Sequence, residues 1–223
     1  MPGSSGTPLR FGVVLLAAGR SSRMGRSKLL LPWGETTVLG HLLQQWQKLG
    51  AEQLAVVMAR DDRAMLQELE RLRFPRENRI TNPQPERGMF SSIQCAAQWP
   101  GWRPRLSHWV IVLGDQPHLR SSTLQAVLDL ASEQPGKVCQ PTFQGRSCHP
   151  VVLSKSIFTY LTDSKASTLK EFLTEFPPAV CEVNDAGLAL DIDYPEDYER
   201  ALELGLKGRK REEGRGREGS RKI

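Results

Sequence analysis

Apolar runs that alternate with amphipathic segments constrain the fold of this chain most strongly. The runs "FGVVLLA" (residues 11–17) and "LAVVMA" (54–59) are nearly continuous in apolar residues, which is typical of central strands in a parallel sheet. Between them, "TTVLGHLLQQWQKLG" (36–50) carries apolar residues at helical spacing and ends at a glycine. A strand, a crossover helix and a second strand are therefore expected at the start of the fold.

The same alternation continues along the chain. We expect helices at 61–72, from 91 onward and at 122–132, and strands at 79–81 and 108–113. Beyond residue 132 the pattern predicts two strands around a glycine turn (137–154), a helix (166–176), short strands at 179–183 and 188–193, and a closing helix (195–206). The prediction is an α/β fold: a Rossmann-like, doubly wound, mostly parallel sheet in a three-layer α/β/α domain.

The positive charge of the chain lies at its C-terminal end. The formal net charge is +5, and residues 207–223 hold eight Lys or Arg against three Glu, so the remainder is formally neutral. We expect a disordered N-terminus (1–10), one domain (11–206) and a basic disordered tail (207–223). No specific nucleic-acid surface, membrane span or signal peptide is expected, which favours a cytoplasmic protein.

The four cysteines lack short repeat spacing. Reduced, partly buried thiols are the expected state in a cytoplasmic chain. A zinc site is the alternative, and it lacks any C-x-x-C pair; its ligands would be Cys139, Cys148, His149 and Cys181.

A basic loop, "AAGRSSRMGRSK" (17–28), follows the first apolar run. Small residues at 17–19 allow a ligand to approach the backbone, and Arg23 and Lys28 carry charge suited to a triphosphate. Met24 occupies the position of the second glycine of a Walker A loop, and no G-x-G-x-x-G is present. The loop therefore predicts phosphate binding; a solvated basic turn is the alternative.

Carboxylates and a histidine follow later predicted strands. Asp115 comes directly after "HWVIVLG", while Asp191 and Asp193 have the i, i+2 spacing that places them on one face of the expected strand. Together these three could hold a divalent ion, although each is also an ordinary cap or turn residue. His149 could contact an acceptor or move a proton; a structural role is the alternative.

These motifs resemble those of one family. "LLAAGRSSRMGRSK" is similar to the L-x-[AG]-G-x-S-x-R-M-G-x-x-K signature of the MobA-like nucleotidyltransferases, and "GDQP", "RGMFSSI" and "DIDYPEDY" resemble later blocks in the same order. The resemblance spans residues 11–206. The "LAAG" version, with Ala18, resembles the molybdenum cofactor cytidylyltransferases, which favour CTP over GTP.

The resemblance implies transfer of a nucleoside monophosphate to a phosphorylated acceptor, with release of pyrophosphate. CTP and molybdopterin are the favoured substrates, Mg²⁺ the cofactor, and a molybdoenzyme a candidate recipient. His149 would face the acceptor, Arg23, Lys28 and Asp115 would be catalytic, and Asp115 with Asp191 or Asp193 would hold the metal. The implied nucleotide-binding residues are Leu16, Ala17, Ala18, Gly19, Arg23, Lys28, Asn82, Gly88, Ser92 and Asp115.

The chain departs from the family pattern at two positions, and other functions stay open. Cys148 stands where the family has glycine before the histidine, and Tyr194 replaces the usual threonine. The alternatives are a GTP-dependent or a sugar- or polyol-phosphate nucleotidyltransferase, and a cofactor carrier without catalysis. The absence of G-x-G-x-x-G disfavours an NAD(P)-dependent oxidoreductase.

Overall fold

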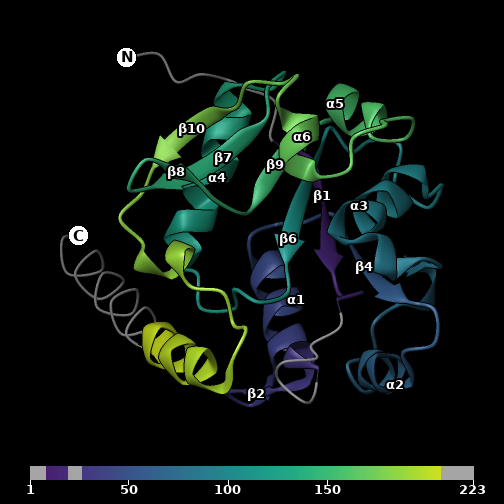
Figure 1. Cartoon of the computed structure of the whole chain (residues 1–223), viewed down its shortest axis with the longest axis vertical. Helices are drawn as coiled ribbons and strands as arrows, with labels where there is room; N and C mark the ends of the chain where they lie inside the picture. Colours follow the sequence, from purple (N-terminus) through teal and green to yellow (C-terminus); the bar gives the residue numbers. More distant parts are fainter. Residues whose placement is uncertain (1–8, 20–26, 207–223) are drawn as a thin grey trace, which may run out of the picture.

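The computed structural model describes residues 9–19 and 27–206. Within them, eight strands form one sheet in the order β10-β7-β9-β6-β1-β4-β5, with β8 paired to β7 (Figure 1). The strands are β1 (Phe11–Leu16), β4 (Gln53–Ala59), β5 (Arg79–Asn82), β6 (His108–Leu113), β7 (Cys139–Phe143), β8 (Arg146–Ser147), β9 (Val151–Ser154) and β10 (Ala179–Glu182). A separate hairpin joins β2 (Pro32–Trp33) to β3 (Thr36–Thr37).

The helices lie between the strands, as the alternation predicts. They are α1 (Val38–Lys48), α2 (Arg63–Arg71), α3 (Met89–Gln98), α4 (Ser121–Glu133), α5 (Lys155–Tyr160), α6 (Leu169–Leu173) and a closing helix at 195–206. Short 3-10 turns occur at η2 (Lys28–Leu30), η3 (Arg76–Asn78), η4 (Pro85–Arg87) and η5 (Ala186–Ala189). None of the described helices is long and apolar enough to cross a lipid bilayer.

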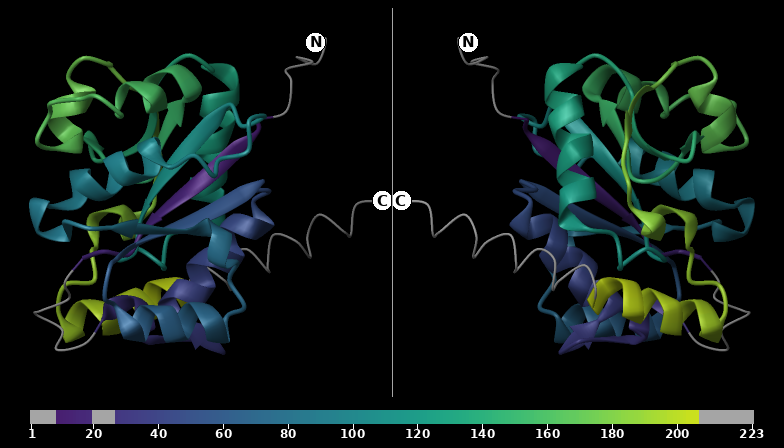
Figure 2. Two further views of the ribbon diagram at one scale, coloured as in Figure 1. Left: turned by 90° about the vertical axis from the view of Figure 1, so that its right-hand side faces the viewer. Right: turned by 90° about the vertical axis from the view of Figure 1, so that its left-hand side faces the viewer.

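Side-chain alternation along β1 builds two cores, one on each face of the sheet. Val13 and Leu15 pack with α1, α2, α4 and the closing helix, whereas Val14 packs with α3, α5 and α6. All three side chains are fully buried. Figure 2 shows the resulting layers of helix, sheet and helix. The predicted three-layer α/β/α class is confirmed.

The sheet is parallel in its first half and mixed in its second. β1 pairs in parallel with β4 and β6, and β4 with β5. β9 instead enters between β6 and β7 and is antiparallel to both. The region 137–154, predicted as two strands, forms three, because the chain turns back after β7 into the short antiparallel strand β8 before β9 begins.

The strand expected at 188–193 does not form. Residues 186–189 are η5, and 190–193 are irregular. The apolar alternation is real, since Leu188 and Ile192 are buried. The backbone, however, bonds to the loop after β6, where Ile192 N donates to Asp115 O at 3.2 Å. The alternation therefore reflects a segment that packs against the molecule without joining a sheet ladder.

The predicted disordered ends lie almost wholly outside the described residues. The predicted tail at 207–223 and positions 1–8 of the predicted N-terminus are not described. Arg10, however, is bonded to the domain: its carbonyl accepts from Ser107 N at 2.8 Å, and its Nε lies 2.9 Å from Glu52 Oε1. The folded domain therefore begins before residue 11.

Candidate functional site

A cavity of about 430 Å³ opens beyond the carboxyl ends of β1 and β6. β1 connects to β4 on one side, and the chain later returns to place β6 on the other, so the cavity lies where strand order reverses. We call it the carboxyl-end cavity; it is lined by Leu16, Ala17, Ala18, Gly19, Ser27, Lys28, Leu29, Pro85, Glu86, Gly88, Met89, Ser92, Leu113, Gly114 and Asp115. Its volume is within the usual range for small-molecule sites.

The loop after β1 forms one wall of this cavity. Ala17 N donates to Val57 O at 2.7 Å, which continues the sheet by one bond, and Ala17 and Ala18 are buried. The chain is described again from Ser27, and Lys28 begins η2 on the cavity wall. Arg23, predicted to bind phosphate, lies outside the described residues.

The loop after β6 forms the facing wall, and Gly114 brings the walls together. A Cβ atom at Gly114 would lie 2.8 Å from Leu29 Cδ2 and 3.2 Å from Leu16 O, so only glycine fits without a shift. The next residue, Asp115, thereby reaches the cavity beside Lys28. The predicted carboxylate and the predicted lysine are thus brought together.

Lys28 lies between two of the predicted carboxylates. Its Nζ is 2.7 Å from Asp115 Oδ2 and 3.5 Å from Asp193 Oδ1, and the Lys28 and Asp115 side chains are about one-fifth exposed. Asp115 Oδ1 is buried and has no hydrogen-bond partner among the described residues. A buried carboxylate oxygen without a donor carries a desolvation cost that a bound cation would offset.

Asp191 is the third predicted carboxylate. Gln116 Nε2 donates to its Oδ1 at 2.9 Å. Burial, and then the nearby charge of Asp115, raise the pKa of the Asp191 carboxyl above its usual value. The described residues contain no cluster of three or more His, Cys, Asp or Glu side chains arranged to hold a metal ion. Instead, Asp115 and Asp193 lie around the Lys28 ammonium, and Asp191 is bonded to Gln116.

A third wall comes from η4 and the start of α3. Gly88, with a φ of +90°, is the N-cap of α3, and both Gly88 and Ser92 of that helix line the cavity. Asn82 is fully buried and donates to Ser91 Oγ at 2.8 Å and Ser92 Oγ at 2.9 Å. Its Oδ1 accepts from the Gln84 amide at 2.9 Å. Asn82 itself does not line the cavity. Its hydrogen bonds hold Ser92, which does, and the loop that begins at Gln84.

His149 does not line the carboxyl-end cavity. It borders a much smaller space of about 10 Å³, together with Gln116. Its Nδ1 is buried without a partner among the described residues, and burial lowers the pKa of the ring, which favours the neutral imidazole. The structure thus places His149 outside the lining of the carboxyl-end cavity, beside the end of β6.

Cys148 is accommodated without backbone strain. Among the described residues other than glycine, only Arg73 and Gln144 have a positive φ. The Cys148 amide donates to Pro141 O at 2.9 Å, and burial raises the pKa of its thiol. No described cluster fits the alternative zinc site, and all four cysteines are free.

Several cavity residues were not predicted. Met89 belongs to the quoted "RGMFSSI" but was given no role. Gln116, which lies outside the cavity lining and donates to Asp191, belongs to "GDQP" and was given no role either. Pro85 and Glu86 come from the polar loop after β5, and Leu113 and Gly114 from the end of β6. Their adjacency to predicted residues was the available signal.

Comparisons with known proteins identify the family of this chain. Residues 13–179 match the model of the MobA-like NTP transferase domain. The chain is 26% identical to the molybdenum cofactor cytidylyltransferase of Escherichia coli over 85% of this chain and 94% of that protein. It is 30% identical to the purine catabolism protein PucB of Bacillus subtilis over 83% of this chain and 93% of that protein.

Solved structures show the same architecture. The crystal structure of Rv0371c from Mycobacterium tuberculosis has a TM-score of 0.69 and 27% identity, and the match covers 88% of this chain and 99% of that one. A second structure of Rv0371c, at 24% identity, a TM-score of 0.65 and coverage of 87% and 98%, is a complex with manganese. The chain belongs to the MobA-like NTP transferase family and is an enzyme of the nucleotidyltransferase type.

Proposed function

We propose that this enzyme transfers CMP from CTP to the terminal phosphate of a molybdopterin-type acceptor. An acceptor phosphate oxygen forms a bond to the α-phosphorus of CTP, and the bond from that phosphorus to the bridging oxygen of the β-phosphate breaks. Pyrophosphate carries the electron pair away. No covalent enzyme intermediate is needed, so the protein contributes positioning and charge neutralisation.

The observation that carries this proposal is the pairing of Lys28 with Asp115 in the wall of the carboxyl-end cavity. A cation and a carboxylate at 2.7 Å supply both partners that a metal-bound triphosphate requires. The small residues at 17–19 leave the opposite wall open to a phosphate chain.

The residues present supply oxygen ligands of the kind that a divalent ion prefers, because Asp115 Oδ1 lacks a donor among the described residues and Asp191 lies near enough to Asp115 for that charge, after burial, to raise its pKa. The carboxylates would have to close around the ion, since among the described residues they form no ready-made metal cluster. Asp115 would hold the ion, with Asp191 or Asp193. When bound, Mg²⁺ would neutralise charge on the phosphates as pyrophosphate departs. The manganese complex of Rv0371c supports a divalent ion in a related fold.

Lys28 would then exchange Asp115 for the triphosphate. In the structure its Nζ is held by carboxylates, and a phosphate oxygen would replace them as its partner. Arg23 would be a second phosphate ligand. Gly88 and Ser92 would contact the nucleoside, with Asn82 holding Ser92 in place. His149 stays a predicted acceptor-side residue, and its buried position favours an indirect contribution.

The preference for CTP rests on Ala18 and on the name of the E. coli relative. Ala18 is buried in the cavity wall, where a side chain restricts the space for the base. The purine catabolism relative shows that family members with other assigned roles are equally similar to this chain. GTP and sugar or polyol phosphates therefore stay as alternative substrates.

A pyrophosphate-release assay tests the proposal. The enzyme would be incubated with Mg²⁺, each of the four NTPs, and either molybdopterin or a sugar phosphate. We expect release with CTP and molybdopterin, and an Ala18→Gly variant should shift the preference toward GTP by several fold. Binding of molybdopterin without turnover by any NTP would instead support the carrier alternative.

A further inference from the structure

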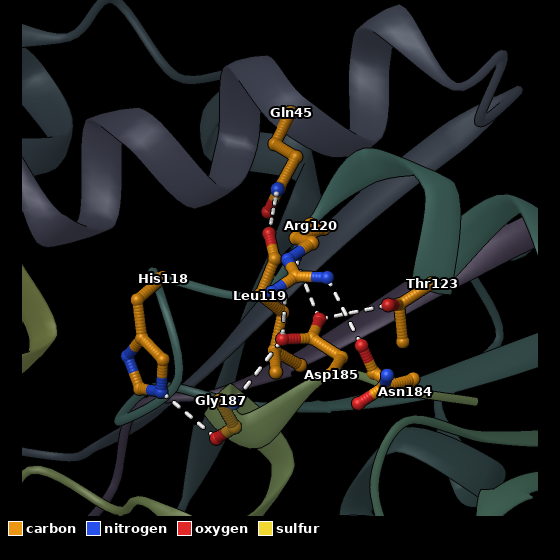
Figure 3. Close-up of polar contacts among 8 residues, drawn as sticks. All are labelled: Gln45, His118, Leu119, Arg120, Thr123, Asn184, Asp185 and Gly187. Atoms are coloured by element: carbon orange, nitrogen blue, oxygen red, sulfur yellow. Dashed lines mark hydrogen bonds and ion pairs between the residues drawn. The ribbon is translucent and has the colours of Figure 1, made fainter. Parts of the chain in front are cut away.

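Asp185 is a buried carboxylate that does not line the carboxyl-end cavity. It is 3% exposed and caps the start of η5, where Gly187 N donates to its Oδ1 at 3.1 Å. Its Oδ2 accepts from Arg120 N at 3.1 Å and from Thr123 Oγ1 at 2.7 Å. Both oxygens are therefore satisfied, and their donors come from two distant parts of the chain (Figure 3).

Arg120 strengthens the same connection. Its Nε lies 3.6 Å from Asp185 Oδ1, and its guanidinium also donates to Asn184 O at 3.0 Å. Arg120 immediately precedes α4, so the residues before η5 are fixed to the start of that helix. Figure 3 shows Arg120 and Thr123 on one side of Asp185 and Gly187 on the other.

Hydrogen bonds between these two segments continue toward the carboxyl-end cavity. His118 Nε2 donates to Gly187 O at 3.0 Å, and Gln116 Nε2 donates to Asp191 Oδ1 at 2.9 Å. Ile192 N then donates to Asp115 O at 3.2 Å. As residue numbers fall from 123 to 115, those of the partners rise from 185 to 192. The two segments form an antiparallel polar zipper that ends at the predicted metal site.

We infer that Asp185 is a positioning residue, which sets where Asp191 and Asp193 lie relative to Asp115. This inference rests on the proposed function, because it assigns the carboxylates of 191–193 to the metal side of that site. η5 and residues 190–193 join no sheet ladder, so the zipper contacts replace the strand pairing that would otherwise fix them.

The amino end of the sheet offers a matched control. Gln53 is likewise buried and joins two loops with three hydrogen bonds: from its Nε2 to Asn78 Oδ1 (3.1 Å) and Gly101 O (2.8 Å), and from Arg103 N to its Oε1 (2.8 Å). Deleting either side chain removes a buried polar hub of similar size. Only Asp185 is connected to the carboxyl-end cavity.

The experiment measures the Mn²⁺-dependent binding of CTP by Asp185→Ala and Gln53→Ala, together with thermal unfolding. Both variants should unfold at a lower temperature than the wild type. We expect Asp185→Ala to weaken the apparent Mn²⁺ affinity about tenfold, with kcat largely recovered at saturating metal. Gln53→Ala should leave the Mn²⁺ affinity unchanged.

Two milder variants keep the test usable if Asp185→Ala does not fold. Thr123→Val removes one donor to Asp185 and should weaken metal affinity two- to threefold. Gly187→Ala retains every donor, but its Cβ would lie 2.9 Å from His118 Cδ2 and 3.1 Å from Asp185 Oδ1, which spreads the zipper. It should weaken metal affinity without removing a polar group.

Two results would contradict the inference, and they are distinguishable. Wild-type Mn²⁺ affinity in all the zipper variants, with CTP binding intact, would overturn the positioning role alone. A wild-type protein that binds no metal–nucleotide would overturn the proposed function and the positioning role together.

Discussion

Two cavities of similar size lie at opposite ends of the sheet, and they differ in how their polar groups are bonded. The carboxyl-end cavity measures about 430 Å³. The second, which we call the amino-end cavity, measures about 450 Å³ and is lined by residues that include Glu52, Gln53, Arg73, Asn78 and Arg103. Size alone therefore does not identify the functional site.

The bonding of the carboxylates separates the two cavities. In the amino-end cavity, Glu52 Oε1 lies 2.9 Å from Arg10 Nε, and both polar atoms of Gln53 are bonded. Glu52 Oε2 accepts no hydrogen bond of good geometry, but it forms an ion pair of 2.7 Å with Arg105 Nε. In the carboxyl-end cavity, Asp115 keeps one buried oxygen without a donor among the described residues. Each oxygen of Glu52 therefore faces an arginine, whereas one oxygen of Asp115 keeps its capacity to bind a cation.

The largest expected contrast is between Asp115→Asn and Glu52→Gln. Loss of the Asp115 charge should lower kcat between about a hundredfold and a thousandfold, as removal of one electrostatic contact to a transition state does. Glu52→Gln, at the other end of the sheet, should leave kcat unchanged. Steady-state pyrophosphate release measures both variants, and equal activities would remove the distinction between the cavities.

Replacing Lys28 should change the affinity for Mn²⁺ about tenfold. In Lys28→Met, Asp115 loses its cation partner, so the nucleotide-free protein should bind Mn²⁺ more tightly, by roughly 1.4 kcal/mol. The same variant should bind CTP more weakly, because a phosphate partner is lost. Electron paramagnetic resonance of free Mn²⁺ measures the first effect and calorimetry the second.

The control for Lys28→Met is Lys155→Met. Lys155 is an exposed residue of α5 whose Nζ donates to Pro104 O at 3.2 Å. If Lys155→Met raised Mn²⁺ affinity as much as Lys28→Met, the effect would come from net charge and not from release of Asp115.

A smaller effect is expected in amide hydrogen exchange. CTP with Mg²⁺ should slow exchange several fold at 16–19 and 113–116, which border the carboxyl-end cavity. Exchange at 52–54 and 101–103, around the amino-end cavity, should not change, since bound ligand protects the elements that it contacts. Protection confined to the second set would reverse the assignment of the two cavities.

The smallest effect concerns His108, a fully bonded group at the amino end of β6. Its Nδ1 lies 2.9 Å from Ser107 Oγ and its Nε2 3.0 Å from Pro135 O, and burial lowers the pKa of the ring. The unfolded chain takes up a proton near pH 6.5 while the folded ring stays neutral. The free energy of unfolding should therefore fall as the pH drops below about 6.5.

The variant His108→Gln isolates that pH dependence. Urea unfolding at pH 7.5 and pH 5.5 should show a difference in unfolding free energy that is smaller by up to about 1 kcal/mol in His108→Gln than in the wild type. A variant with the full wild-type difference would show that His108 does not titrate as its burial implies.

Local patterns predicted the first half of the fold, because its strands can be recognised from their own residues. β1, β4 and β6 are buried on both faces, and continuous apolar runs identify such strands without knowledge of their partners. The direction of β9 could not be predicted in this way. "VVLS" reads the same in a parallel and an antiparallel pairing, and only the connection through β8 sets its direction.

The candidate site could be predicted where its polar residues directly follow a strand in the sequence. It could not be predicted where residues from distant segments meet in the folded chain. Lys28 and Asp115 follow buried strands, so their meeting at one edge could be expected. Asp185 reads as a turn residue in "VNDAG", and its partner Thr123 is 62 positions away. A contact that is likewise distant in sequence explains the wrong strand at 188–193, because Ile192 N donates to Asp115 O instead of to a neighbouring strand.

The most direct test is a crystal structure with CTP and Mn²⁺, with anomalous diffraction measured at the manganese edge. It shows whether Asp115 Oδ1, which has no donor among the described residues, binds a metal ion. We predict a manganese peak beside Asp115 Oδ1, with Lys28 moved from Asp115 to the triphosphate. A complex with CTP in the cavity, an intact Lys28–Asp115 pair and no manganese at Asp115 would contradict that claim.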